Sequence, residues 1–111
     1  MDYNQANKEA WEEAFAKHQQ GYKEDPTTRL KRGDLTILED DVRAALDKID
    51  LESKIVAQFC CNNGRELLTL LNMGASSGTG FDITENFAAE GRRLAHENNL
   101  NAEFIATDIY D

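Results

Sequence analysis

One tight turn and two aspartates carry the candidate chemistry of this sequence. The turn is Cys60-Cys-Asn-Asn-Gly64, and Asp82 and Asp108 each follow a short segment with apolar residues. Asp82 lies 18 positions beyond Gly64. An acidic residue about 20 positions past a ligand-binding turn typically accepts hydrogen bonds from ribose hydroxyls. Asp108 can accept from the exocyclic amine of a base. The pattern therefore predicts a site for an adenosine that carries a further group at its 5′ end.

The residues beside these groups suit the same ligand. Ile83 and Ile109 follow the two aspartates and can supply apolar faces for an adenine ring. Asn62 tolerates a positive φ angle better than most residues other than glycine. Cys60 and Cys61 are small enough to let a ligand approach the backbone. The turn also places backbone N–H groups and a helix N-terminus at the end of a strand, where α/β sheets bind ligands.

Alternating strand and helix patterns position these residues. Strands are predicted at 54–60, 77–82 and 103–107, separated by helices over 64–73 and 84–98. Connections between parallel strands are right-handed, which gives a Rossmann-like α/β sheet of three parallel strands in the order 3-2-1. In that order the turn, Asp82 and Asp108 meet at one rim. Gly91 in the middle of a helix costs about 1 kcal/mol relative to alanine, so we expect close packing against the sheet there.

Residues 1–53 are predicted to form a helical cap and connector, and residues 54–111 the ligand-binding portion. A helix over 4–20 carries Trp11 and Phe15 on one stripe. It either docks on the domain or covers the ligand site as a lid, with His18 or Tyr22 at its edge.

A polar connector is expected over 22–34. A second helix should begin with a capping box of Thr36 and Glu39 and run to Lys48. Its expected apolar face is made of Leu38, Val42, Leu46 and Ile49.

The composition of the chain argues against several classes of function. The chain has 111 residues and a formal net charge of −9, which argues against binding to a nucleic-acid backbone. The two cysteines are adjacent, and no spaced set of cysteine and histidine residues suggests a metal site. We interpret both as reduced thiols of a cytoplasmic protein. No signal peptide or membrane-spanning run is recognised.

Three segments give the sequence a resemblance to the class I S-adenosylmethionine-dependent methyltransferases. They are Val56-Ala-Gln-Phe-Cys-Cys-Asn-Asn-Gly64, Gly80-Phe-Asp-Ile-Thr84 and Phe104-Ile-Ala-Thr-Asp-Ile109. The resemblance implies S-adenosylmethionine as cofactor and transfer of its methyl group to an acceptor that the sequence does not identify. It places the 60–64 turn under the methionine part, Asp82 at the ribose, and Asp108 with Ile109 at the adenine.

The first segment departs from the family pattern, which has an acidic residue followed by three alternating glycines. Here these positions hold Gln58, Cys60, Asn62 and Gly64, which together with Cys61 are the cofactor contacts expected in this segment. A nicotinamide fingerprint fits no better. It requires glycine at positions 62, 64 and 67, and these positions hold Asn62, Gly64 and Leu67. Another adenine-nucleotide binder, or a scaffold module that has lost the cofactor, remains the alternative.

Methyltransferases of this class normally continue with a fourth strand beside the first. We therefore expect this chain to be the cofactor-binding portion of a larger enzyme and to be inactive by itself. No catalytic residue is assigned. An unpaired edge of the first strand invites self-association, so a homo-oligomer or cover by the N-terminal segment is expected.

Overall fold

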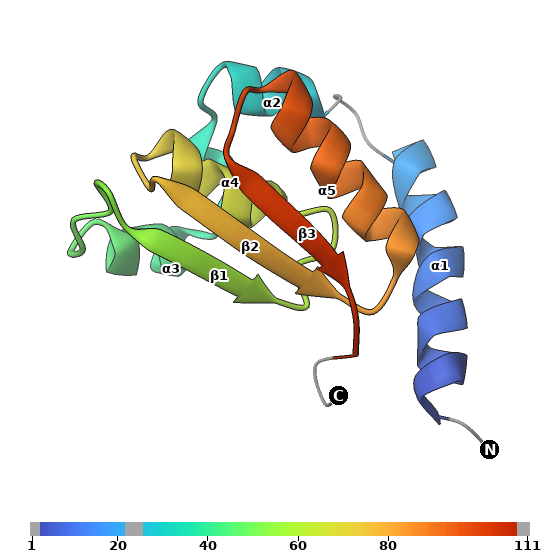
Figure 1. Ribbon diagram of the computed structural model, residues 1–111. Coiled ribbons are helices and arrows are strands. Elements are labelled where there is room, and N and C mark those ends of the chain that lie inside the picture. Colours follow the sequence, from blue (N-terminus) through green and yellow to red (C-terminus); the bar gives the residue numbers. More distant parts are fainter. Residues whose placement is uncertain (1–2, 22–25, 109–111) are drawn as a thin grey trace.

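Three parallel strands form the centre of the computed structural model (Figure 1). It describes the backbone of residues 3–21 and 26–108 and the side chains of residues 3–15 and 27–108. The strands are β1 (Ile55–Phe59), β2 (Ser77–Asp82) and β3 (Ala102–Ala106), in the order β1-β2-β3. Gln58 lies opposite Gly80, which in turn lies opposite Phe104. The predicted parallel sheet and its order are confirmed, and the carboxyl ends of all three strands meet at one rim.

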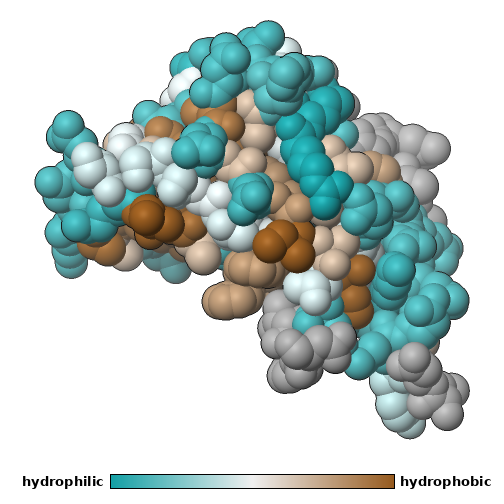
Figure 2. All heavy atoms as spheres, in the orientation of Figure 1, coloured by the Kyte–Doolittle hydropathy of each residue, from teal (hydrophilic) through white to brown (hydrophobic). Residues whose placement is uncertain are grey.

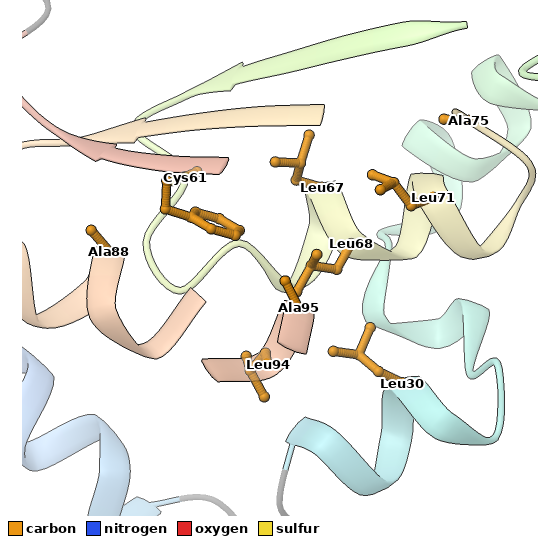
Figure 3. Packing of buried hydrophobic residues seen from close by; sticks show 10 residues of the cluster. Leu30, Cys61, Leu67, Leu68, Leu71, Ala75, Ala88, Leu94 and Ala95 are labelled. Carbon is orange, nitrogen blue, oxygen red and sulfur yellow. The ribbon is translucent and has the colours of Figure 1, made fainter. Parts of the chain in front are cut away.

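Helices cover one face of this sheet. They are α4 (Arg65–Asn72), α5 (Glu85–Glu97) and the short α2 (Pro26–Lys31). Leucines of all three helices meet the inward side chains of the strands in a single buried cluster (Figure 3). Its members are Leu30, Cys61, Leu67, Leu68, Leu71, Ala75, Ala88, Leu94, Ala95 and Phe104. Burial of these apolar groups on one side of the sheet is the main force that holds the helices to the strands.

Phe104 occupies a space that three glycines leave open. A Cβ atom on Gly64 would lie 2.2 Å from the Phe104 ring, and one on Gly80 or Gly91 would lie within 2.8 Å of it. The ring is 3% exposed. Gly91 therefore lets α5 approach β3, as the sequence predicted. The same space explains why the glycine-containing β2 is a strand despite the low strand propensity of glycine.

The N-terminal helix α1 (Tyr3–Gly21) packs against α5. Phe15 meets Phe87 edge to face, with the ring centroids 5.1 Å apart. The part of the chain expected to be a polar connector contains α2 instead, with Thr27 and Leu30 buried. The missed signal was Pro26, since proline is favoured at the first position of a helix.

The predicted capping box of Thr36 and Glu39 is wrong. Residues Leu35–Ile37 form a short 3-10 helix, η1, and the helix α3 (Asp40–Leu46) begins only after it. Asp34 accepts hydrogen bonds from the backbone and hydroxyl of Thr36, and Arg29 donates to the same carboxylate. These bonds stop a helix from starting at Thr36, because they hold the local turn that competes with it.

The apolar face expected of this helix is also only partly correct. Leu38 is buried in an extended conformation, whereas Val42 and Ile49 are 44% and 51% exposed.

The other face of the sheet carries apolar side chains that the described residues do not cover. Ile55, Phe59 and Ile105 are 80%, 63% and 41% exposed, and Figure 2 shows apolar atoms on this face among polar ones. An apolar run such as that of β1 is typical of a buried strand, but here Val56 and Gln58 are only partly buried and the alternate residues of the strand are exposed. In the described ranges, no strand pairs with its outer edge.

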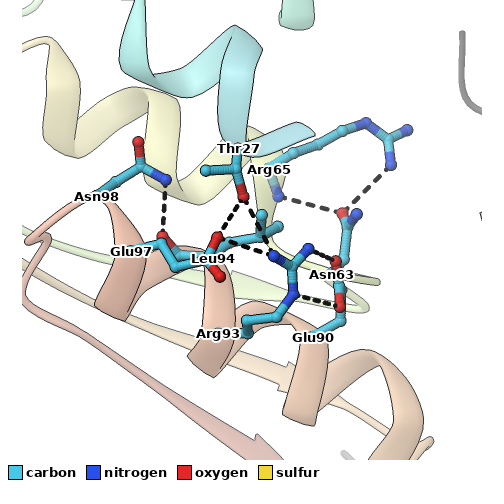
Figure 4. A network of polar contacts seen from close by, with 8 residues as sticks. All are labelled: Thr27, Asn63, Arg65, Glu90, Arg93, Leu94, Glu97 and Asn98. Carbon is cyan, nitrogen blue, oxygen red and sulfur yellow. Dashed lines mark hydrogen bonds and ion pairs between the residues drawn. The ribbon is translucent and has the colours of Figure 1, made fainter. Parts of the chain in front are cut away.

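A polar network joins α2 to α5 behind the sheet (Figure 4). Arg93 of α5 bonds Glu90 and Glu97 of the same helix, and Thr27 of α2 donates to Glu97 at 2.8 Å. This network fixes the helical layer on which the strand ends depend.

Candidate functional site

The turn after β1 has an alternating backbone conformation. Cys60, Asn62 and Gly64 have φ angles of 55°, 53° and 75°, all in the left-handed region. The N–H of Cys61 donates to the carbonyl of Phe81 at 3.1 Å, which ties the turn to the end of β2. Asn62 and Gly64 adopt this region readily, whereas Cys60 adopts it at a cost. The result is a tight bend that ends at the N-terminus of α4.

Asp82 joins the ends of two strands. One carboxylate oxygen accepts from the N–H of Asn62 at 2.9 Å. The other accepts from the N–H and the hydroxyl of Thr84, at 3.0 and 2.8 Å. Asp82 is only 7% exposed, so these bonds are shielded from bulk water. Since a carboxylate has about four acceptor positions, the oxygen that faces Asn62 retains capacity for another donor.

A hollow of about 390 Å³ lies between α1 and the rim of strand ends. This volume lies within the range of small-molecule sites. Both predicted aspartates line it, together with residues of the turn and of α1. The lining residues are Asn4, Asn7, Trp11, Cys60, Asn62, Asp82, Ile83, Thr107 and Asp108.

Five of the predicted binding residues therefore line the hollow, whereas Asn4, Asn7 and Thr107 line it without having been predicted. Asn4, Asn7 and Trp11 are spaced three and four positions apart, which places them on one face of a helix. That spacing was the available signal. Trp11 lines the hollow and is 45% exposed. Both interpretations of α1 apply to part of the helix. Phe15 docks α1 on α5, and Trp11 lies over the hollow. The side chain of His18 and all of Tyr22 lie outside the described residues.

Three predicted binding residues do not line the hollow. Cys61 is buried in the core, where burial and the nearby Asp82 carboxylate raise the pKa of its thiol to about 12. Gly64 is buried under Phe104. Gln58 has a buried amide oxygen with no hydrogen-bond partner among the described residues. Ile109, the other predicted adenine contact, lies outside the described residues.

Comparison with known proteins gives a consistent result. No protein-family profile matches the chain. Over 53 residues, 48% of this chain, it is 36% identical to the ribosomal protein L11 methyltransferase of Neisseria gonorrhoeae, and it spans 18% of that protein's length. The crystal structure of TehB from Haemophilus influenzae matches 73% of the chain with 28% identity and a TM-score of 0.60, over 27% of its own length.

A third comparison covers almost the whole chain. The magnesium protoporphyrin IX methyltransferase of Synechocystis PCC 6803, solved with bound S-adenosylmethionine, matches 97% of it with a TM-score of 0.71. At 17% identity and over 55% of the other chain, this likeness concerns the fold. The fold is that of the class I methyltransferases. The resemblance seen in the sequence is thus confirmed.

The positive φ angles of the turn fall on the three positions that hold glycine in the family pattern. Cys60 and Asn62 adopt this conformation here without being glycine.

None of the helices in the described ranges is long and apolar enough to cross a membrane. No group of three or more histidine, cysteine or acidic side chains is placed there to hold a metal ion.

Proposed function

We propose that this chain binds S-adenosylmethionine at the rim of strand ends, as the cofactor-binding portion of a methyltransferase. The observation that carries the proposal is the convergence of Asn62, Asp82 and Asp108 on one hollow beneath α1. The likeness to methyltransferases of known structure supports the same cofactor. When bound, this cofactor supplies a methyl group attached to a sulfonium sulfur. The neutral thioether that remains after transfer is a good leaving group.

The residues of the rim divide the work of binding. The 60–64 turn brings its backbone to the methionine part of the cofactor. Asp82 accepts from a ribose hydroxyl through the oxygen that already receives the Asn62 N–H. Asp108 accepts from the adenine amine, and Ile83 supplies an apolar surface for the ring.

Methyl transfer needs alignment more than acid–base chemistry, because the leaving group is already activated. The chain has two free thiols, one of them exposed, which suits a reducing compartment. We therefore propose a cytoplasmic location.

Calorimetric titration with S-adenosylhomocysteine tests the proposal. We expect micromolar binding by the unmodified chain. Asp108→Ala should weaken it roughly 10- to 100-fold, since a hydrogen bond to a charged group is lost. Asp40→Ala is the matched control, because the Asp40 side chain is fully exposed on α3 and does not line the hollow.

Asp82→Ala is a poor test, because it also removes the hydrogen bond from Asn62 that joins the strand ends and the two hydrogen bonds from Thr84 just before α5. Asp82→Asn keeps the size of the side chain but replaces one acceptor oxygen by an NH2 donor, which then faces an N–H donor of Asn62 or Thr84. Asp108→Ala is therefore the cleaner variant. No detectable binding of S-adenosylhomocysteine by a folded chain would contradict the proposal and favour a scaffold module.

A further inference from the structure

The aromatic side chains of α1 have three different environments. Phe15 packs against Phe87, and Tyr3 is 77% exposed. Trp11 lies between these extremes, since it lines the hollow with 45% of its surface still exposed. An indole so placed has surface left to bury against a ligand.

The position of α1 decides which part of the ligand Trp11 meets. Phe15, one helical turn after Trp11, anchors α1 on α5, and α5 connects β2 to β3. Figure 1 shows α1 on the β3 side of the sheet, away from β1. Among the residues that line the hollow, Ile83 follows β2, and Thr107 and Asp108 follow β3.

This arrangement provides an aromatic wall where the base is expected. Flat rings stack well on tryptophan, and loss of such a contact by alanine substitution typically weakens binding markedly. The methionine part of a cofactor offers no ring to stack.

We infer that Trp11 is a specificity-determining residue that stacks on the adenine base, opposite Ile83, and thereby closes α1 over the bound nucleoside. The inference rests on the proposed function, because it concerns the same hollow. It assigns to α1 a direct contact with ligand in addition to its packing on α5.

Trp11 is the single tryptophan of the chain, so its fluorescence reports on this position alone. The probes are S-adenosylhomocysteine, adenosine and methionine, titrated separately. We expect S-adenosylhomocysteine and adenosine to change the emission, and methionine to leave it unchanged at concentrations that saturate the others.

Calorimetry of variants gives the second measurement. Trp11→Ala should raise the Kd for S-adenosylhomocysteine roughly 5- to 100-fold, and Trp11→Phe should retain most of the affinity. Tyr3→Ala, an exposed aromatic of the same helix, is the matched control and should bind as the unmodified chain does. Circular dichroism checks that each variant is folded.

The outcomes separate this inference from the proposed function. If S-adenosylhomocysteine binds the unmodified chain without a change in Trp11 emission, and Trp11→Ala binds within twofold, the role of Trp11 is overturned and the proposed function stands. If S-adenosylhomocysteine does not bind at all, the proposed function fails and this inference fails with it.

Discussion

Cys60 holds a backbone conformation that its own side chain disfavours. Its φ angle of 55° lies in the left-handed region, which costs a non-glycine residue about 1–2 kcal/mol. Replacement by glycine removes that cost and adds a smaller loss of chain entropy. We expect Cys60→Gly to raise the free energy of unfolding by about 1 kcal/mol, measured by urea denaturation. Cys60→Ala keeps a Cβ and should give no gain. A destabilised Cys60→Gly variant would contradict this account of the turn.

The two adjacent thiols should differ in reactivity. Cys60 is exposed at the hollow, whereas Cys61 is buried and its pKa is raised to about 12. Iodoacetamide at pH 8 should therefore modify Cys60 alone, because the thiolate is the reactive form. Peptide mass spectrometry checks the site, and S-adenosylhomocysteine should slow the reaction. Equal modification of both cysteines in the folded chain would show that Cys61 is not buried as described.

The same pKa makes stability depend on alkaline pH. Cys61 stays neutral in the folded chain up to about pH 12, whereas its ordinary pKa is 9.0. The unfolded chain loses the Cys61 proton above pH 9, whereas the folded chain keeps it. The contribution of Cys61 to the free energy of unfolding is therefore complete below pH 9 and is lost as the pH rises toward 12. The fall in the free energy of unfolding over that interval should be smaller in Cys61→Ala, as urea titrations at several pH values would show. An identical pH profile for both chains would be the opposing result.

The site residues that directly follow a strand could be predicted from the sequence. Asp82 and Asp108 follow strands, and parallel strands in the predicted order must deliver both to one rim. The spacing of Asn4 and Asn7 placed them on one face of a helix, but their position at the hollow depends on where α1 packs, which local sequence does not determine. The same holds for the core position of Cys61, which depends on the direction its side chain takes in a turn with positive φ angles.

Helix α5 lies close to β3 because Gly91 has no side chain. At an exposed helical site, Gly91→Ala would stabilise by about 1 kcal/mol. Here the new Cβ would lie 2.7 Å from the Phe104 ring. We expect a net destabilisation of about 1–3 kcal/mol, the usual cost of overpacking a core, measured by denaturant unfolding.

A double variant provides the control for that explanation. Combining Gly91→Ala with Phe104→Leu should cost less than the sum of the two single changes, because leucine removes the ring that the methyl group meets. If Gly91→Ala is as stable as the original chain, the close contact between α5 and β3 is not what the glycine provides.

Among the elements, those of the sheet were predicted best. Both strand–helix–strand units showed their periodicity and turn residues directly in the sequence. The region from 26 to 48 was predicted poorly, since the Asp34 carboxylate accepts hydrogen bonds from the backbone and hydroxyl of Thr36, which the prediction had placed in a capping box. That competition depends on Arg29 of α2, an element the sequence analysis did not recognise.

Among the described residues, one face of the sheet is open and the outer edge of β1 has no strand partner. We propose that copies associate through the outer edge of β1, where Ile55 and Phe59 are exposed. Helix α1 packs on α5, on the β3 side, so it does not serve as the expected N-terminal cover. Sedimentation velocity should detect a dimer or larger species, and Ile55→Lys should weaken it. A monodisperse monomer whose β1 amides exchange freely would contradict this proposal.

The central claim is that the rim of strand ends and α1 together receive one nucleoside-containing cofactor. Amide chemical shifts, recorded by NMR during titration with S-adenosylhomocysteine, test it at every described position at once. The account predicts the largest shifts at residues 60–64, 82–84 and 107–108 and on the Trp11 face of α1. Shifts confined to α3 or to the open face of the sheet, or no shifts at saturating ligand, would contradict it.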